Sequence, residues 1–268
     1  MTGWAMGLAI EHMKYSRLLV LIAPVLILIF SELVIFLPSL FFTSLLLSNL
    51  AVLAAILVFI KAGKTKKTFD IYLGTAILPL GFLSSIFVYS SLAVNRFFIQ
   101  FLFLAAVGFI YFYLRYLYYY LVRPEFCSGD TLKNFSSFGN FFIIFFSASA
   151  IYGLQSFLNL PVWLLMIFML IITFLAVYQI MWTNKVEIKP AFAHILVSGV
   201  VLLEIGWSIS FLPLNHNMAG LVLAICYYIL ISLSLSFLDN NLDRKIIKQY
   251  LVFGFIGIFI VLLSARWM

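Results

Sequence analysis

The sequence predicts an all-α, polytopic transmembrane helical bundle of about nine spans, built as four outward-turning helical hairpins and a final helix. Of the 268 residues, 65% are hydrophobic and only 9% are charged, and the mean hydropathy is +1.18. A soluble domain carries roughly 25% charged residues, so most of this surface is expected to face lipid. The chain is also divided into apolar runs of about 20 residues, the length that crosses a hydrocarbon core roughly 30 Å thick.

The apolar runs place the spans and group them into hairpins. The hairpins are expected at 17–60, 70–122, 135–182 and 191–238, with the final helix at 248–265, in a single bundle over 17–268. Residues 1–16 are expected to form a short N-terminal interfacial segment, and Met1 and Met13 remain alternative starts. The individual spans are predicted at residues 17–37, 40–60, 70–91, 96–122, 135–158, 160–182, 191–212, 217–238 and 248–265.

The breaks between spans alternate between short uncharged turns and longer basic loops, and this alternation predicts the orientation. Three of the short turns contain Phe-Leu close to a proline, FLP at 36–38, FLNLP at 157–161 and FLP at 211–213. This pattern is typical either of duplicated hairpins or simply of proline in short turns. With the N-terminus inside, fourteen of the sixteen Lys and Arg residues lie on the inner side, and only Arg96 and Arg266 lie outside. The positive-inside rule therefore predicts an N-in, C-out topology.

No motif for catalysis, metal binding or cofactor binding is found. The chain has no H-E-x-x-H, G-x-S-x-G, P-loop or paired-Asp signature, and Cys127 and Cys226 lack the spacing of a zinc or redox site. The basic residues lie at the ends of apolar runs, not in a stripe interleaved with aromatics, which argues against nucleic acid as a partner. We therefore expect no catalytic residue, no cofactor and no metal, and the sequence favours a non-enzyme embedded in the lipid bilayer.

The stretch LLEIGWSISFLPLNHN (202–217) places the carboxylate of Glu204 inside an apolar span. A charge at the centre of a span costs roughly 2.5–3.5 kcal/mol on insertion scales. We therefore expect Glu204 to face the interior of the bundle, with Trp207 beside it on the same face. Gly199 and Gly206 would let a neighbouring helix approach closely.

Glu32, Glu204, Trp207 and His194 together form the candidate intramembrane polar site. Glu32 precedes the first FLP turn by four residues, and both carboxylates are expected to line one outward-opening cavity if the hairpins are repeats. His194 lies ten residues before Glu204, too far along the helix to touch it. The alternatives are that Glu32 contacts interfacial water and that Glu204 makes a structural interhelical hydrogen bond. Arg115, near the inner end of its span, is expected to snorkel, and the tyrosines of 111–124 are expected to form an interfacial belt.

The C-terminal third resembles an uncharacterised family of bacterial polytopic inner-membrane proteins. The matching elements are Glu204, Trp207, the FLP turn, the basic link within NNLDRKIIKQ (240–249) and the terminal Ala265-Arg266-Trp267, over about the last 80 residues. The resemblance implies a multi-pass protein of the bacterial cytoplasmic membrane, and it implies no substrate.

Three classes of function remain open. The first is a carrier or binder of a small molecule or lipid, with Glu32 and Glu204 near its site. The second is a non-catalytic subunit or scaffold that docks a membrane or cytoplasmic protein partner, with KAGKTKK (61–67) and NNLDRKIIKQ as docking segments. The third, an intramembrane enzyme, is the least favoured because no catalytic constellation is present.

Overall fold

The computed structural model describes residues 3–63, 68–123, 129–186 and 188–264. Within these residues the protein is all-α, and nine helices are long and apolar enough to cross a membrane, which confirms the predicted all-α class and the number of candidate spans. Lys64, Lys66, Lys67, Cys127 and Ala265-Arg266-Trp267 lie outside the described residues. The helices are α1 (Gly3–Phe36), α2 (Phe41–Ala62), α3 (Phe69–Ser90), α4 (Arg96–Val122), α5 (Gly129–Leu158), α6 (Val162–Thr183), α7 (Ile188–Ile209), α8 (His216–Leu238) and α9 (Arg244–Ser264), and a 3₁₀ turn, η1 (Pro38–Leu40), precedes α2.

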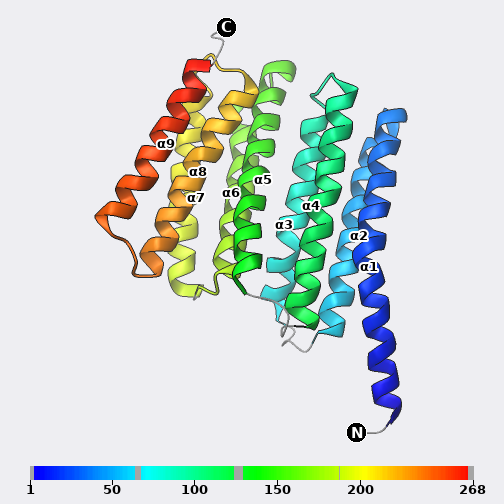
Figure 1. Ribbon diagram of the computed structural model, residues 1–268. Helices are drawn as coiled ribbons and strands as arrows, with labels where there is room; N and C mark the ends of the chain where they lie inside the picture. Colours follow the sequence, from blue (N-terminus) through cyan, green and yellow to red (C-terminus); the bar gives the residue numbers. More distant parts are fainter. Residues whose placement is uncertain (1–2, 64–67, 124–128, 187, 265–268) are drawn as a thin grey trace. The chain divides into compact units, whose positions relative to one another are not determined.

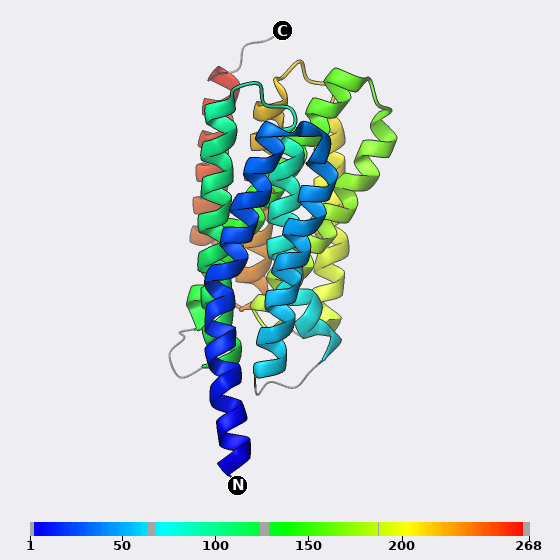
Figure 2. The same cartoon turned by 90° about the vertical axis from the view of Figure 1, so that its right-hand side faces the viewer.

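Most helix boundaries agree with the predicted spans to within a few residues, and the exceptions have local causes. α1 begins at Gly3, so the residues expected to form a separate interfacial segment continue the first helix, whose N-terminal turns project past the ends of α2 and α4 (Figures 1 and 2). α5 begins at Gly129, before the predicted residue 135. Its first turns are polar, so a search for apolar runs does not detect them. α7 ends at Ile209, before the predicted residue 212, because Pro213 disfavours helical backbone in the residue before it.

Asparagines lie in three of the short turns, and the side chains of two of them cap the helix that follows. The Asn95 Oδ1 accepts hydrogen bonds from the backbone N–H groups of Phe97 and Phe98 at 3.0 and 3.5 Å, capping α4. The Asn215 Oδ1 accepts one from Asn217 N–H at 3.2 Å at the start of α8. Asn159, after α5, has φ of 51°, a left-handed conformation that asparagine tolerates better than most residues. These turns satisfy backbone groups that a helix end otherwise leaves unpaired.

The chain divides into two compact units, Met1–Ser136 and Ser137–Met268, with the boundary inside α5. The sequence predicts one bundle over 17–268, without this division. In unit 1, α1 packs against α2 and α4, α2 packs against α3 and α4, and α3 packs against α4. In unit 2, α6 packs against α7, α7 against α8, and α8 against α9.

Aromatic rings fill the interior of unit 1. The ring of Phe87 in α3 lies 5.1 Å from that of Phe103 in α4, and the ring of Phe59 in α2 meets Tyr118 in α4 edge-on at 5.8 Å. Such tilted and edge-on pairs match the charge distribution of aromatic rings. All four side chains are buried, so large rings set the spacing between these helices.

A buried tyrosine compensates for a proline in α3. Pro79 has no N–H, so the carbonyl of Thr75, four residues earlier, lacks its usual helical donor. The hydroxyl of Tyr113 in α4 donates to that carbonyl at 2.7 Å. The polar group that Pro79 leaves unpaired is therefore satisfied from the neighbouring helix, which also links α3 to α4.

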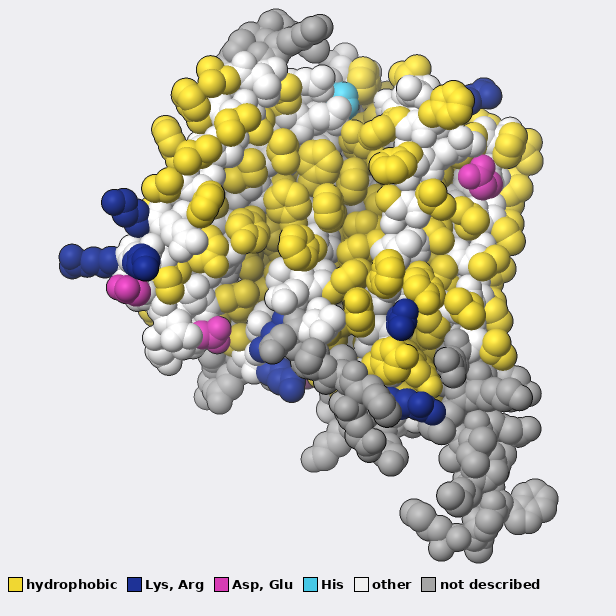
Figure 3. Space-filling view, in the orientation of Figure 1, with side chains coloured by type: hydrophobic (Ala, Val, Ile, Leu, Met, Phe, Trp, Pro, Cys, Tyr) yellow, Lys and Arg dark blue, Asp and Glu magenta, His cyan; other side chains and the backbone are white. Residues whose placement is uncertain are grey.

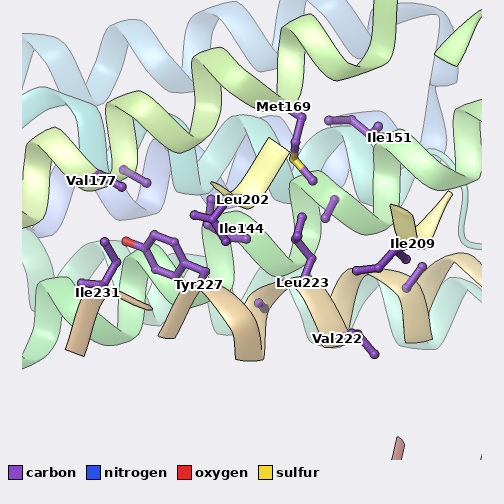
Figure 4. Packing of buried hydrophobic residues seen from close by; sticks show 14 of the residues in the cluster. Ile144, Ile151, Met169, Val177, Leu202, Ile209, Val222, Leu223, Tyr227 and Ile231 are labelled. Carbon is purple, nitrogen blue, oxygen red and sulfur yellow. The ribbon is translucent and has the colours of Figure 1, made fainter. Parts of the chain in front are cut away.

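Unit 2 has a continuous apolar core contributed mainly by α5, α6, α7 and α8. Small residues let its helices approach closely: a Cβ added at Gly220 of α8 would clash with the Ser149 side chain of α5 and lie 2.8 Å from its backbone nitrogen. Gly199 of α7 likewise accommodates the ring of Phe174 in α6. Figure 4 shows core side chains between these helices, among them Ile144, Met169, Leu202, Leu223 and Tyr227.

Candidate functional site

The helix α7 presents one face to the core of unit 2 and the opposite face to its surroundings. Leu202, Gly206 and Ile209 are buried, and their spacing of four and three residues follows one side of a helix. Glu204 comes two residues after Leu202, which is about 200° around the helix axis at 3.6 residues per turn. The side of α7 that carries Gly206 therefore packs against the core of unit 2, and Glu204 lies on the opposite side.

Glu204 is exposed, so it does not face the interior of its own unit. The reason lies in the small residues of the same helix. Gly199 accommodates Phe174, and the carbonyl of Gly206 accepts a hydrogen bond from the hydroxyl of Tyr152 in α5 at 2.8 Å. These close contacts fix the rotation of α7 about its axis and leave the carboxylate outside.

Around Glu204, exposed residues form a continuous apolar surface, which we call the α7 stripe. Trp207 is 55% exposed and Phe211 is 72% exposed, and their rings lie 6.0 Å apart. The side chain of Glu204 makes no ion pair with any residue that the structure describes, and its own backbone carbonyl accepts from Ser208 Oγ at 2.8 Å. The α7 stripe consists of Phe192, Leu196, Val197, Val200, Glu204, Trp207, Ser208 and Phe211.

The carboxylate lies well inside the apolar span. The candidate span in α7 is Ala191–Ser210, so Glu204 is about 5 Å from its midpoint at 1.5 Å per residue. The α7 stripe thus places one ionisable group in the middle of an outward-facing hydrophobic surface.

The four residues of the predicted polar site do not form one cluster within a unit. Trp207 lies beside Glu204 on the α7 stripe, as expected from its spacing. His194 is half-buried elsewhere on α7, with its ring 5.8 Å from that of Phe237 in α8. Glu32, half-buried in α1, belongs to unit 1 and is one turn from the end of that helix.

A second set of polar groups lies buried inside unit 2. The Asn140 amide in α5 donates to the Gln179 side-chain oxygen in α6. Unit 1 has a comparable bond, in which Asn49 Nδ2 of α2 donates to Ser84 Oγ of α3 at 3.3 Å. Both asparagines thus make the interhelical hydrogen bonds that polar residues in membrane spans commonly make. The Asn140 Oδ1 and the hydroxyl of Tyr227 are buried, and neither has a hydrogen-bond partner among the residues that the structure describes. Sequence reasoning missed Tyr227 and Tyr152, because a tyrosine in an aromatic-rich span carries no signal of its orientation.

No cluster of three or more His, Cys, Asp or Glu side chains suited to a metal ion is found among the described residues. Over the described residues the fold defines a class of protein: an all-α chain of apolar, membrane-length helices, in which the carboxylate of Glu204 is exposed within a span.

The chain belongs to the DUF5656 family of proteins of unknown function, whose model matches residues 38–264. No curated protein and no solved structure matches the chain. The family match spans α2 to α9 together with η1, so it extends far beyond the last 80 residues on which the sequence-based resemblance depended.

Proposed function

We propose that this protein is a non-catalytic membrane subunit that docks a transmembrane helix of a partner protein on the α7 stripe. In this proposal it is a multi-pass protein of the bacterial cytoplasmic membrane with N-in, C-out topology. The observation that carries the proposal is the exposure of Glu204 in the middle of an apolar span. The excess of Lys and Arg on one side of the predicted spans supports the orientation.

The cost of an exposed carboxylate in lipid supports a protein partner over lipid as the neighbour of the α7 stripe. An acidic side chain near the middle of a span costs roughly 2.5–3.5 kcal/mol on insertion scales, and an apolar residue at position 204 would avoid this cost. A partner helix offering Lys, Arg or another hydrogen-bond donor would compensate the charge where lipid chains offer no donor. The neighbouring Trp207 and Phe211 supply large, rigid apolar contact area, as residues at the centres of interfaces often do.

The proposal predicts opposite effects of Glu204→Leu on the isolated protein and on the assembly. The purified protein should unfold at the same or a higher temperature, because the substitution removes a carboxylate from an exposed apolar face and no described partner of Glu204 is lost. Binding of the partner in the native membrane should weaken. Circular dichroism of the purified protein during heating measures the first effect, and a marked fall in the unfolding temperature would contradict it.

Site-specific photo-crosslinking in the native membrane measures the second effect. A photo-reactive residue at Val200, one turn from Glu204 on the α7 stripe, should yield a cross-link to a protein, and Glu204→Leu should reduce it. The matched control is Ile171 in α6, which is mid-span and 49% exposed where Val200 is 47% exposed. Equal protein cross-linking at both positions would contradict a specific surface. A product of twice 30.6 kDa would show a second copy of the chain as the occupant instead.

A carrier or binder of a small molecule is the second candidate function, and the interior of unit 2 is the observation that favours it. The unpaired Asn140 Oδ1 and Tyr227 hydroxyl could hold a polar solute or water between the spans. If the protein is a carrier, the Asn140 Oδ1 and the Tyr227 hydroxyl would contact the solute, which is the role that the sequence suggested for Glu204. Reduced solute uptake by vesicles containing the Tyr227→Phe variant, with unchanged folding, would favour the carrier.

A further inference from the structure

Arg115 in α4 lies between two tyrosines of the same helix. Tyr111 and Tyr119 come four residues before and after it, which places all three on one helix face, and all three line one pocket. Arg115 itself is exposed. Snorkelling accounts for an exposed arginine near the end of a span, but it does not account for a pocket beside the guanidinium.

The three residues border a pocket between α4 and α1, which we call the Arg115 pocket. Its volume is about 220 Å³, and it is lined by Val20, Leu21, Tyr111, Arg115, Tyr118 and Tyr119. This is many times the roughly 10–15 Å³ that one water molecule requires, but less than the roughly 300–1,000 Å³ of a site that encloses a drug-sized ligand. The pocket therefore has room for a small polar group of a larger molecule.

The walls of the Arg115 pocket offer both polar and apolar contacts. Pro24 in α1 has no N–H, so the carbonyl of Val20, four residues earlier, lacks its usual helical donor. The Thr75 carbonyl, which Pro79 leaves without a helical donor, accepts from Tyr113. The Val20 carbonyl instead belongs to a residue that lines a pocket. Leu21 and the Val20 side chain supply hydrocarbon surface beside the guanidinium. Figure 3 shows dark-blue side chains over the lower part of α4 surrounded by yellow hydrophobic ones.

The Arg115 pocket lies towards an end of unit 1 where further cations are exposed. Arg115 precedes the end of α4 at Val122 by seven residues, about 10 Å along the axis. The ends of α2 and α4 are in contact, because a Cβ at Gly63 would lie 2.8 Å from the Leu121 carbonyl oxygen. Lys61 and Arg123 at these ends are exposed, and Asp70 in the first turn of α3 is the acidic residue described there.

We propose that the Arg115 pocket binds a phosphate oxyanion, supplied by the headgroup of an anionic membrane lipid. A guanidinium has five N–H donors, in the fork geometry that suits the oxygens of a phosphate. The hydroxyls of the tyrosines that line the pocket can donate to the same oxyanion. The carbonyl of Val20 can accept from a headgroup hydroxyl, and the Val20 and Leu21 side chains contact the acyl chains. This site lies in unit 1 and is independent of the α7 stripe.

Lipid titrations of the full-length protein in detergent, read by native mass spectrometry, test the proposal. The probes are phosphatidylglycerol, phosphatidylcholine and diacylglycerol. The wild-type protein should bind phosphatidylglycerol most tightly, and Arg115→Gln should weaken that binding about tenfold, since a hydrogen-bonded charge pair is lost. Arg115→Lys should lie between the two, because a lysine keeps the charge without the fork. Lys61→Gln, which removes an exposed cation at the same end, should change the affinity less than twofold.

Several results would overturn this assignment. Equal phosphatidylglycerol affinity in the wild type and Arg115→Gln, or an equal loss in Lys61→Gln, would show that binding depends on overall charge or lies elsewhere. Arg115→Lys provides the comparison if Arg115→Gln fails to fold. Competition by inorganic phosphate at millimolar concentration distinguishes the two sources of the oxyanion. Unchanged lipid binding supports the lipid headgroup, and displacement of the lipid would show that the pocket takes free phosphate.

Discussion

The two units of this protein hold their helices together by different means. Unit 1 separates α2, α3 and α4 with large aromatic rings, of which Phe87 and Phe103 are fully enclosed. Unit 2 brings α5 and α8 almost to backbone contact at Gly220 and Ser149. Lipid chains are as apolar as the side chains they would replace, so helices in a membrane associate mainly through close packing and hydrogen bonds. Unit 1 achieves close packing mainly with aromatic rings, and unit 2 achieves it with small residues.

The surfaces of the two units differ as well. Unit 1 exposes a cation, Arg115, at a pocket near one end of its helices. Unit 2 exposes a carboxylate, Glu204, on a smooth apolar helix face near mid-span. A cation near a helix end is within reach of lipid phosphates, whereas a carboxylate at mid-span is not. This difference is why we assign a lipid to the first surface and a protein helix to the second.

The largest expected effect tests the close contact in unit 2. Gly220→Ala should destabilise the protein by about 3 kcal/mol or more, because the new methyl group would clash with Ser149 and its backbone. Hydrogen exchange measured on peptides of the full-length protein should show loss of protection in α5 and α8, with α2 to α4 unchanged.

The matched control for this substitution is Gly108→Ala in α4, where an added Cβ would meet nothing within 4 Å. It should be neutral or stabilise the protein by up to about 1 kcal/mol through helix propensity. Similar losses from both substitutions would show that unit 2 does not depend on close contact more than unit 1 does.

An intermediate effect tests the polar contact in unit 1. Tyr113→Phe should destabilise the protein by about 1–3 kcal/mol, because it leaves the buried Thr75 carbonyl without a donor. Pro79→Ala should reduce this loss, since an alanine at 79 can supply the helical N–H that the proline lacks. Unfolding of the two single variants and the double variant measures the coupling between the two positions. Strictly additive losses would mean that the tyrosine does not compensate for the proline.

The smallest expected effect compares the buried amides of the two units. Asn140→Leu in unit 2 should cost about 1 kcal/mol by removing its hydrogen bond to Gln179, in the range measured for such bonds in membranes. Asn49→Leu in unit 1 should cost less, because Asn49 is only half-buried and its interhelical bond to Ser84 Oγ is long, at 3.3 Å. Thermal unfolding in detergent ranks the two variants, and the reverse order would show that unit 1 is the more dependent on interhelical polar contacts.

Much of the architecture was predictable because it depends on local sequence. An apolar run of 20 residues in lipid has to pair its backbone groups within itself, and a helix does so without any neighbour. The short turns could also be located, since Pro38, Pro161 and Pro213 mark them. Asn140 and Gln179 are polar residues within apolar spans, and they bond between helices as such residues commonly do.

The sequence by itself determined how many membrane-length helices form over the described residues, approximately where most of them begin and end, and which residues lie on one face of a helix, because these follow from local hydrophobicity and the period of 3.6. Which face turns inward depended on the tertiary structure. The rotation of α7 follows from how Phe174 fits at Gly199 and how Tyr152 reaches the Gly206 carbonyl, and these contacts come from helices distant in the sequence. Arg115 carried a signal, with tyrosines four residues on either side, but the pocket beside it exists only because α1 packs against α4. Packing between helices depends on the shapes of many side chains together. The position of Glu204 in the sequence therefore does not show whether its side chain faces the core or the surroundings.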